Sequence, residues 1–133
     1  MVKLVRHLVR VVQATRREKA KREIRSPQWP RVEKEHLAKH PTCAACGGSK
    51  RPQVHHEKPF HTDPSLELDP NNLITLCMGK FECHIRIGHG DSFEYYNPHV
   101  VTHAARVMAH PDQREAVEAE AKLRRVRNEP GGS

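Results

Sequence analysis

Four cysteines stand in two pairs whose spacing suits a metal ion. Cys43 and Cys46 are separated by two residues, so a tight turn can bring both sulfurs to about 2.3 Å from one zinc ion. Cys77 and Cys83 have five residues between them and need a small loop to do the same. The sequence therefore predicts a structural zinc site with four cysteine ligands, contributing on the order of 10 kcal/mol to folding.

Glycines beside these cysteines fit the same role. Gly47 and Gly48 let the first turn fold back so that backbone N–H groups can point at the thiolates, and Gly79 suits the loop of the second pair. Four unligated thiols or a redox pair are the alternatives. The two pairs frame a histidine-rich centre, which favours zinc.

Histidines form a second set of residues able to do chemistry. His55 and His56 lie in one expected strand, and His84 lies in the first turn of a helix expected near Glu82. A hairpin followed by a helix brings these positions side by side, so His55 and His84 can share one divalent cation. Because adjacent side chains of a strand point to opposite sides, His56 faces elsewhere and can handle a proton.

The elements that must position these residues follow from hydrophobic spacing and from proline and glycine. A short strand through Val54 and a second over residues 73–76 enclose a long loop rich in Pro and Asp. Helices are expected over residues 2–25, from Trp29 to about His40, near Glu82, over residues 99–109 and over residues 111–127. The fold class is α+β.

Charge is concentrated at the start of the chain. The net charge is +7, and residues 1–25 hold nine Lys/Arg against two Glu, whereas the rest holds fourteen of each sign. This basic amphipathic arm predicts contact with a polyanion; a solvated helix face is the alternative. The sequence shows neither a signal peptide nor a membrane span, and the expectation is a soluble protein of the cytoplasm.

Several short motifs follow one another in a fixed order. They are Arg25-Ser26-Pro27-Gln28-Trp29, Cys43-Ala44-Ala45-Cys46-Gly47, Val54-His55-His56, Glu67-Leu68-Asp69-Pro70-Asn71-Asn72-Leu73-Ile74-Thr75-Leu76-Cys77, Cys83-His84, Gly88-His89 and Tyr96-Asn97-Pro98. Over roughly residues 26–100 the chain thus resembles the HNH endonuclease family (ββα-metal, or His-Me finger), in particular its small zinc-binding phage versions.

The resemblance implies an organisation and a site. A basic arm over residues 1–25 would precede a zinc-stapled nuclease domain with a ββα-metal core over 26–110, and a C-terminal helix and tail would occupy 111–133. The family's metal ligands fall on His55 and His84, its general base on His56 and its bracing asparagine on Asn72. His55 stands where the family often has aspartate, so the catalytic cation is Mg²⁺, Mn²⁺, Ni²⁺ or Zn²⁺.

The implied reaction is one-metal hydrolysis of a phosphodiester bond. His56, kept neutral by a backbone carbonyl, would take a proton from the attacking water, leaving 5′-phosphate and 3′-hydroxyl ends. The implied partner is double-stranded DNA, in the cytoplasm of a bacterium or phage-infected host, with phage packaging proteins as further partners.

Three residues near the motif have open roles. His89 and His61 are candidates for contact with the metal or a phosphate, and Arg86 is a candidate for contact with a phosphate. Two other functions compete with the nuclease. A catalytically silent zinc module that binds nucleic acid explains the cysteines and the charge, and a redox protein would use Cys43 and Cys46. Neither uses His55, His56, Asn72 and His84.

Overall fold

A computed structural model describes residues 24–127 and shows a mixed α+β fold. The basic helix expected over residues 2–25 lies outside the described residues except for Ile24 and Arg25, which are not helical. The tail from residue 128 lies outside as well. In chain order the elements are α2 (Trp29–Lys39), β1 (Pro52–His56), η1 (Pro64–Leu66), η2 (Pro70–Asn72), β2 (Leu73–Cys77), η3 (His84–Gly88), α3 (Val100–Ala109), η4 (Pro111–Gln113) and α4 (Arg114–Val126).

The two strands pair antiparallel, as the hairpin prediction required. Their register places His55 opposite Ile74 and His56 opposite Leu73. The connecting loop, residues 57–72, contains the two short 3₁₀ helices η1 and η2. Each of these begins with proline and is capped by the preceding aspartate, Asp63 or Asp69, whose side chain accepts a backbone N–H.

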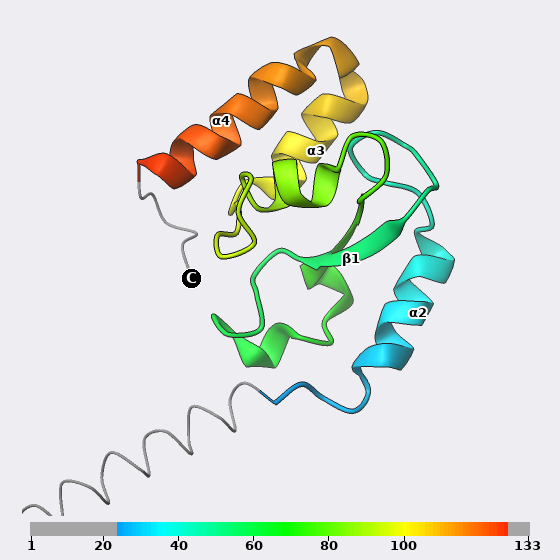
Figure 1. Ribbon diagram of the computed structural model, residues 1–133. Helices are drawn as coiled ribbons and strands as arrows, with labels where there is room; N and C mark the ends of the chain where they lie inside the picture. Colours follow the sequence, from blue (N-terminus) through cyan, green and yellow to red (C-terminus); the bar gives the residue numbers. More distant parts are fainter. Residues whose placement is uncertain (1–23, 128–133) are drawn as a thin grey trace, which may run out of the picture.

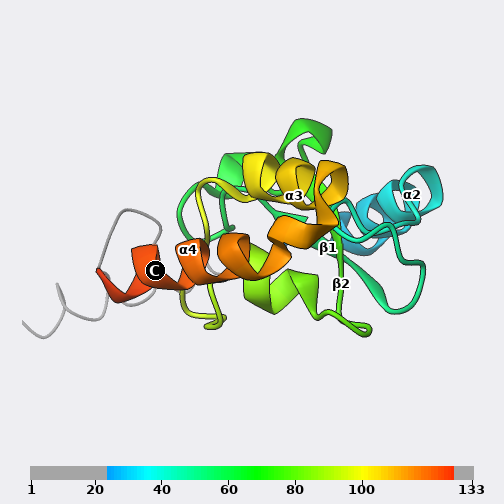
Figure 2. The same cartoon turned by 90° about the horizontal axis from the view of Figure 1, so that it is seen from above.

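Helices cover the hairpin from two directions (Figures 1 and 2). The helix α2 lies against both strands on one side, and η3 contacts both strands and also packs against α3 and α4 on the other. A two-stranded sheet is marginal by itself in water, so this packing is what keeps the hairpin in place.

The core joins these layers and includes the cysteines. Its fully buried apolar side chains come from β2, η3, α3 and α4: they are Leu76, Ile87, Val100, Val107 and Val117. Cys43, Cys77 and Cys83 belong to the same cluster. A metal ion bound by these thiols would therefore tie together the elements that form the core.

Most elements agree with the sequence predictions, and one is shorter than a typical helix. The helix expected near Glu82 is a five-residue π-helix, His84–Gly88. Its last carbonyls are used by Asn97, whose side chain donates to the Ile87 carbonyl and whose backbone N–H donates to the Gly88 carbonyl. Within residues 24–127, no helix has the length and apolar character needed to cross a membrane.

Candidate functional site

The four cysteines meet at one point beside the hairpin. Cys43 and Cys46 lie on the turn after α2. Cys77 ends β2, and Cys83 directly precedes η3. All are free thiols, and their Sγ atoms lie within 4.8 Å of one another. Cys46 Sγ and Cys77 Sγ are 3.6 Å apart, close to the roughly 3.8 Å expected for two sulfurs on a tetrahedral zinc ion. The cluster could therefore hold one metal ion such as zinc.

Several N–H donors surround these sulfurs. The backbone N–H of Gly48 donates to Cys46 Sγ (3.4 Å), and that of Cys46 donates to Cys43 Sγ (3.5 Å). The Arg114 guanidinium donates to Cys83 Sγ (3.3 Å). The hydrogen bond between the Cys83 and Cys43 thiols lowers the pKa of Cys43 and raises the pKa of Cys83, and burial raises the pKa of Cys46. The N–H donors favour the thiolate form, which is the form that binds metal.

Three histidines form a second cluster where β1 meets η3. His55 comes from β1, His84 is the first residue of η3, and His89 follows the end of η3. The ring centroids of each pair are 4.7 to 5.0 Å apart, and one nitrogen of each ring lies within 4.8 Å of the others. The structure thus brings His55 and His84 together and adds His89 to them.

Hydrogen bonds fix which nitrogen carries the proton in the rings of His84 and His89. His89 Nδ1 donates to the Tyr95 carbonyl (2.6 Å), and His84 Nδ1 donates to Gln53 Oε1 (2.7 Å). Both Nε2 atoms therefore carry lone pairs, and they face each other at 3.2 Å. Without a cation between them these lone pairs repel. Two nitrogens on a tetrahedral metal ion lie roughly 3.3 Å apart, so the observed distance fits a metal.

The third ring of the cluster supplies an unpaired buried nitrogen. His55 Nε2 is buried, and within the described part of the chain it has no hydrogen-bond partner. An unpaired buried polar atom is costly, which makes a metal bond at this position favourable. Burial lowers the pKa of all three histidines, well below the ordinary value for His55 and to about 4 for His84. The rings are therefore neutral, as metal ligands must be.

A glycine makes room for this arrangement. A Cβ atom at Gly88 would lie 3.1 Å from two atoms of the His55 ring. Any larger residue at the end of η3 would therefore force the His55 ring and the Leu76 side chain to shift by a few tenths of an ångström.

The candidate general base, His56, is held by residues from two other parts of the chain. Its Nε2 donates to the Glu67 carbonyl (2.9 Å), and its ring lies 4.5 Å from that of Trp29 between centroids. The buried Glu67 carboxylate in turn accepts the Ser26 N–H (2.9 Å) and one Arg25 N–H (3.2 Å). Because a carbonyl can only accept, the His56 proton sits on Nε2 and the lone pair is on Nδ1.

Asn72 braces the loop between β1 and β2 through three hydrogen bonds to backbone groups. Its Oδ1 accepts the Lys58 N–H (2.9 Å), and its Nδ2 donates to the carbonyls of Lys58 (3.0 Å) and Leu66 (3.2 Å). The side chain thus closes both ends of the segment that follows β1. This segment leads to Glu67, whose carbonyl holds His56.

A cavity of about 370 Å³ opens over these histidines. Its lining includes His55, His56, His84 and His89 together with Arg25, Phe60, His61 and Phe93. His61 is thus brought to the site. Phe93 packs against the rings of His84 and His89 and stays 57% exposed at the rim. The cavity joins a possible metal position, a possible base and a cation in one space.

Arg86 is placed away from this cavity. Its guanidinium lies 3.5 Å from the Glu82 carboxylate and 4.0 Å from that of Glu118. It does not line the cavity. A phosphate held by the histidine cluster would therefore not meet this arginine.

Residues remote in sequence complete both clusters. Gln53, Tyr95 and Glu67 orient the histidines, and Arg114 reaches the cysteines from α4. No local pattern marks these residues, because their partners lie 6 to 31 positions away.

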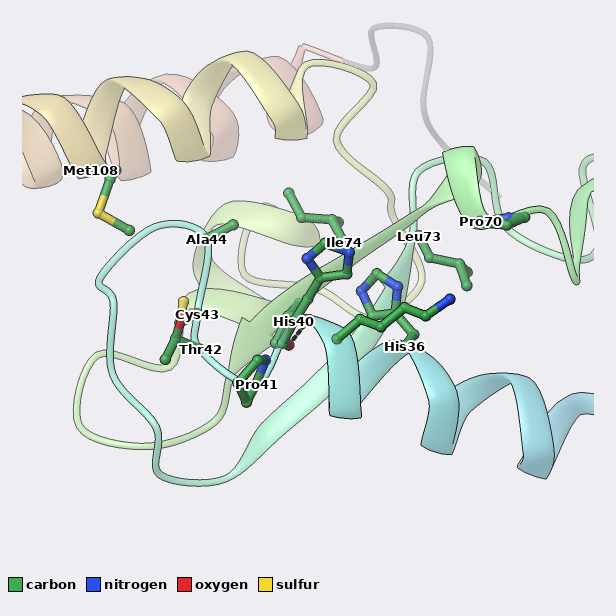
Figure 3. A pocket seen from close by; sticks show the side chains of 12 residues that line it. His36, His40, Pro41, Thr42, Cys43, Ala44, Pro70, Leu73, Ile74 and Met108 are labelled. Atoms are coloured by element: carbon green, nitrogen blue, oxygen red, sulfur yellow. Dashed lines mark hydrogen bonds between the residues drawn. The ribbon is translucent and has the colours of Figure 1, made fainter.

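Another hollow, of about 380 Å³, lies between the end of α2, the cysteine turn and β2 (Figure 3). His36 and His40 of the α2 end line it, with Met108 of α3 opposite them. It contains none of the five histidines that line the first cavity. Two imidazoles are a poorer metal site than either cluster.

No protein-family model matches this chain, and neither does any curated protein or solved structure.

Proposed function

We propose that this protein is a metal-dependent DNA endonuclease of the HNH kind, which hydrolyses phosphodiester bonds. The observation that supports it most is the pairing of a three-histidine cluster with His56 in one open cavity. His55 and His56 are neighbours on β1, yet one ring joins the cluster and the other contacts Trp29 and Glu67. This separation would allow His55 to bind a metal ion and His56 to act as a base.

In this proposal His55, His84 and His89 would hold one divalent cation through their free nitrogens. Bound there, the cation would stabilise negative charge on the phosphate and on the leaving 3′-oxygen. Gln53 and the Tyr95 carbonyl, by accepting the Nδ1 protons, keep the Nε2 lone pairs of His84 and His89 available. All-imidazole ligation suits Zn²⁺, Ni²⁺ or Mn²⁺ better than it suits Mg²⁺.

His56 acts as the general base. Its Nδ1 lone pair accepts a proton from a water molecule as that water attacks phosphorus. The bond from phosphorus to the 3′-oxygen breaks, and the released oxygen takes up a proton from solvent. Burial lowers the pKa of His56, so the ring is neutral at physiological pH and ready to accept the proton. The Glu67 carbonyl fixes the reactive tautomer. The products carry 5′-phosphate and 3′-hydroxyl ends.

Asn72 takes no part in the chemistry and acts on structure. Its three hydrogen bonds hold the loop after β1, and the same loop supplies the carbonyl that orients His56. The four-cysteine cluster would likewise act through structure, with bound zinc holding the turn after α2 against the hairpin and η3.

The proposed substrate is double-stranded DNA, supported by the basic excess in residues 1–25. The proposal places the enzyme in the cytoplasm of a bacterium or phage-infected host, with phage packaging proteins as further partners.

A plasmid assay tests the proposal. Supercoiled plasmid is incubated with zinc-loaded protein and Mg²⁺, Mn²⁺, Ni²⁺ or additional Zn²⁺, and nicked and linear products are measured. We expect cleavage with at least one cation and none after chelation. His56→Ala should lose about 10²–10⁴ in rate, the usual contribution of a positioned base. His110→Ala, at an exposed histidine outside the cavity, is the matched control.

The competing functions give different results. Zinc in the purified protein without cleavage under any cation would favour a silent nucleic-acid-binding module. Cleavage that survives in the folded His56→Ala protein would refute the assigned base.

A further inference from the structure

Negative charge is missing from one part of the described fold. Residues 36–56 and 70–81, which form the cysteine turn, the hairpin and the loop after β2, contain no Asp or Glu. They contain four cations: Lys39, Lys50, Arg51 and Lys80. These segments are therefore positive, and Glu82, the acidic residue that directly follows the second of them, is paired with Arg86 (3.5 Å).

Three of these cations belong to two loops in direct contact. The Met78 backbone N–H donates to the Arg51 carbonyl (2.9 Å), and a Cβ atom at Gly79 would lie 3.0 Å from the Lys50 carbonyl. Lys50, Arg51 and Lys80 are all exposed, and within residues 24–127 none of them forms an ion pair. Three unneutralised charges thus lie on adjoining loops.

An aromatic ring and a hollow lie among these charges. Phe81 is 40% exposed, and the Lys80 ammonium lies 5.2 Å from its ring centroid. On α4, the Arg114 guanidinium lies 4.3 Å from the same ring. Lys50, Lys80 and Phe81 line a hollow of about 280 Å³ whose wall includes Cys46 and Cys77. Cations beside an exposed apolar ring suit a sugar-phosphate chain, in which anionic and apolar groups alternate.

We propose that this basic face, made of Lys50, Arg51, Lys80 and Phe81, binds the DNA backbone on one side of the cut. The identity of the polyanion rests on the proposed nuclease function. Strand β1 leads from the basic face to the histidine cluster, and the four steps from Arg51 to His55 span roughly 13 Å. For a duplex lying along β1, at 3.4 Å per base pair, the contacted phosphates would lie roughly four base pairs from the scissile one.

Salt-dependent binding tests the proposal. The affinity of zinc-loaded protein for a fluorescent DNA duplex of about two helical turns is measured by anisotropy at several salt concentrations, without added catalytic cation. The affinity falls as salt rises, and each lost phosphate contact makes the slope of log affinity against log salt shallower by about 0.9. The Lys50→Gln/Lys80→Gln variant should therefore lose about 1.8 from the slope, and about tenfold or more in affinity at moderate salt.

The matched control removes the same charge elsewhere. Lys34 on α2 and Lys122 on α4 are both exposed and lie outside the basic face, so Lys34→Gln/Lys122→Gln should keep the wild-type slope. Identical slopes for both double variants would overturn the proposal. The same measurement with an RNA duplex gives a second test. A slope that becomes shallower in Lys50→Gln/Lys80→Gln with RNA but not with DNA would also overturn the proposal, because the basic face would then bind RNA. Bound zinc and circular dichroism verify that each variant is folded.

Binding and cleavage can fail separately. If no cation supports plasmid cleavage but the slope falls in Lys50→Gln/Lys80→Gln, the basic face stands and the nuclease function is wrong. If cleavage depends on His56 but both slopes agree, the nuclease function stands and the basic face is wrong. Phe81→Leu, which keeps apolar bulk, should weaken binding with little change in slope.

Discussion

The Nε2 atoms of His84 and His89 face each other at 3.2 Å while the Nδ1 atom of each ring is already hydrogen bonded. A proton or a metal ion must lie between such lone pairs for the contact to be favourable. Because burial lowers the pKa of both rings, a proton is disfavoured and a metal ion is the better candidate.

Removing His89 should therefore weaken metal binding at the histidine cluster. Loss of an outer partner of a metal ligand typically costs about 10–100-fold in affinity, so loss of the ligand itself should cost at least as much. We expect calorimetric titration of the zinc-loaded wild type with Ni²⁺ or Mn²⁺ to show one further site, which His89→Ala weakens by about a hundredfold or more. His110→Ala should behave like wild type; an unchanged site in His89→Ala would show that this ring is not a ligand.

Asn72→Ala should destabilise the protein and slow any cleavage. The change leaves one N–H and two carbonyls of the loop without their partner, and an unsatisfied buried group costs about 1–3 kcal/mol. Urea unfolding measures the loss. Asn71→Ala is the matched control, because this neighbouring residue is exposed and should change stability by less than about 0.5 kcal/mol. Equal effects at the two positions would contradict the bracing role.

The sequence was sufficient to predict those elements and site residues whose positions depend on a local pattern. Hydrophobic spacing, proline and glycine predicted the hairpin that carries His55 and His56, and proline also marked the starts of α2 and of the segment leading into α4. The spacing of Cys43 and Cys46 predicted their convergence with the second pair. Arg114 and Gln53 could not be identified, because tertiary packing alone brings them to their partners 31 residues away. His89 reaches the cluster through the π-helix and the loop held by Asn97, which helical spacing does not reveal.

Metal removal should unfold the core. Three of the four cysteines are fully or almost fully buried in it. Removing the metal ion would replace its bonds by free thiols, and such an ion contributes on the order of 10 kcal/mol to folding. We expect a strong chelator to abolish the cooperative thermal transition and zinc to restore it. Arg114→Gln, which loses a charged donor to Cys83, should lower zinc affinity by about 10–100-fold. A chelated, metal-free protein with an unchanged transition would contradict a structural metal.

Acid should destabilise the fold partly through His103, which lies away from both clusters on α3. Asn97 Nδ2 donates to His103 Nδ1 (2.7 Å), so a proton on that nitrogen would place two donors face to face. Burial lowers the pKa of His103, although the Glu120 carboxylate, 3.6 Å from Nε2, acts in the opposite direction. As pH falls through about 6.5, the unfolded histidine binds a proton before the native one does, so stability decreases until the lower native pKa is reached. His103→Gln stays neutral and can still accept from Asn97.

The slope of unfolding free energy against pH should therefore be smaller in His103→Gln, by up to about 1.4 kcal/mol per pH unit over that interval. Urea unfolding from about pH 7.5 to about pH 5 measures it. Both proteins lose the same metal-linked stability in acid, so the difference between their curves isolates this group. His110→Gln controls for an exposed histidine; parallel curves for wild type and His103→Gln would show that His103 takes up its proton equally in both states.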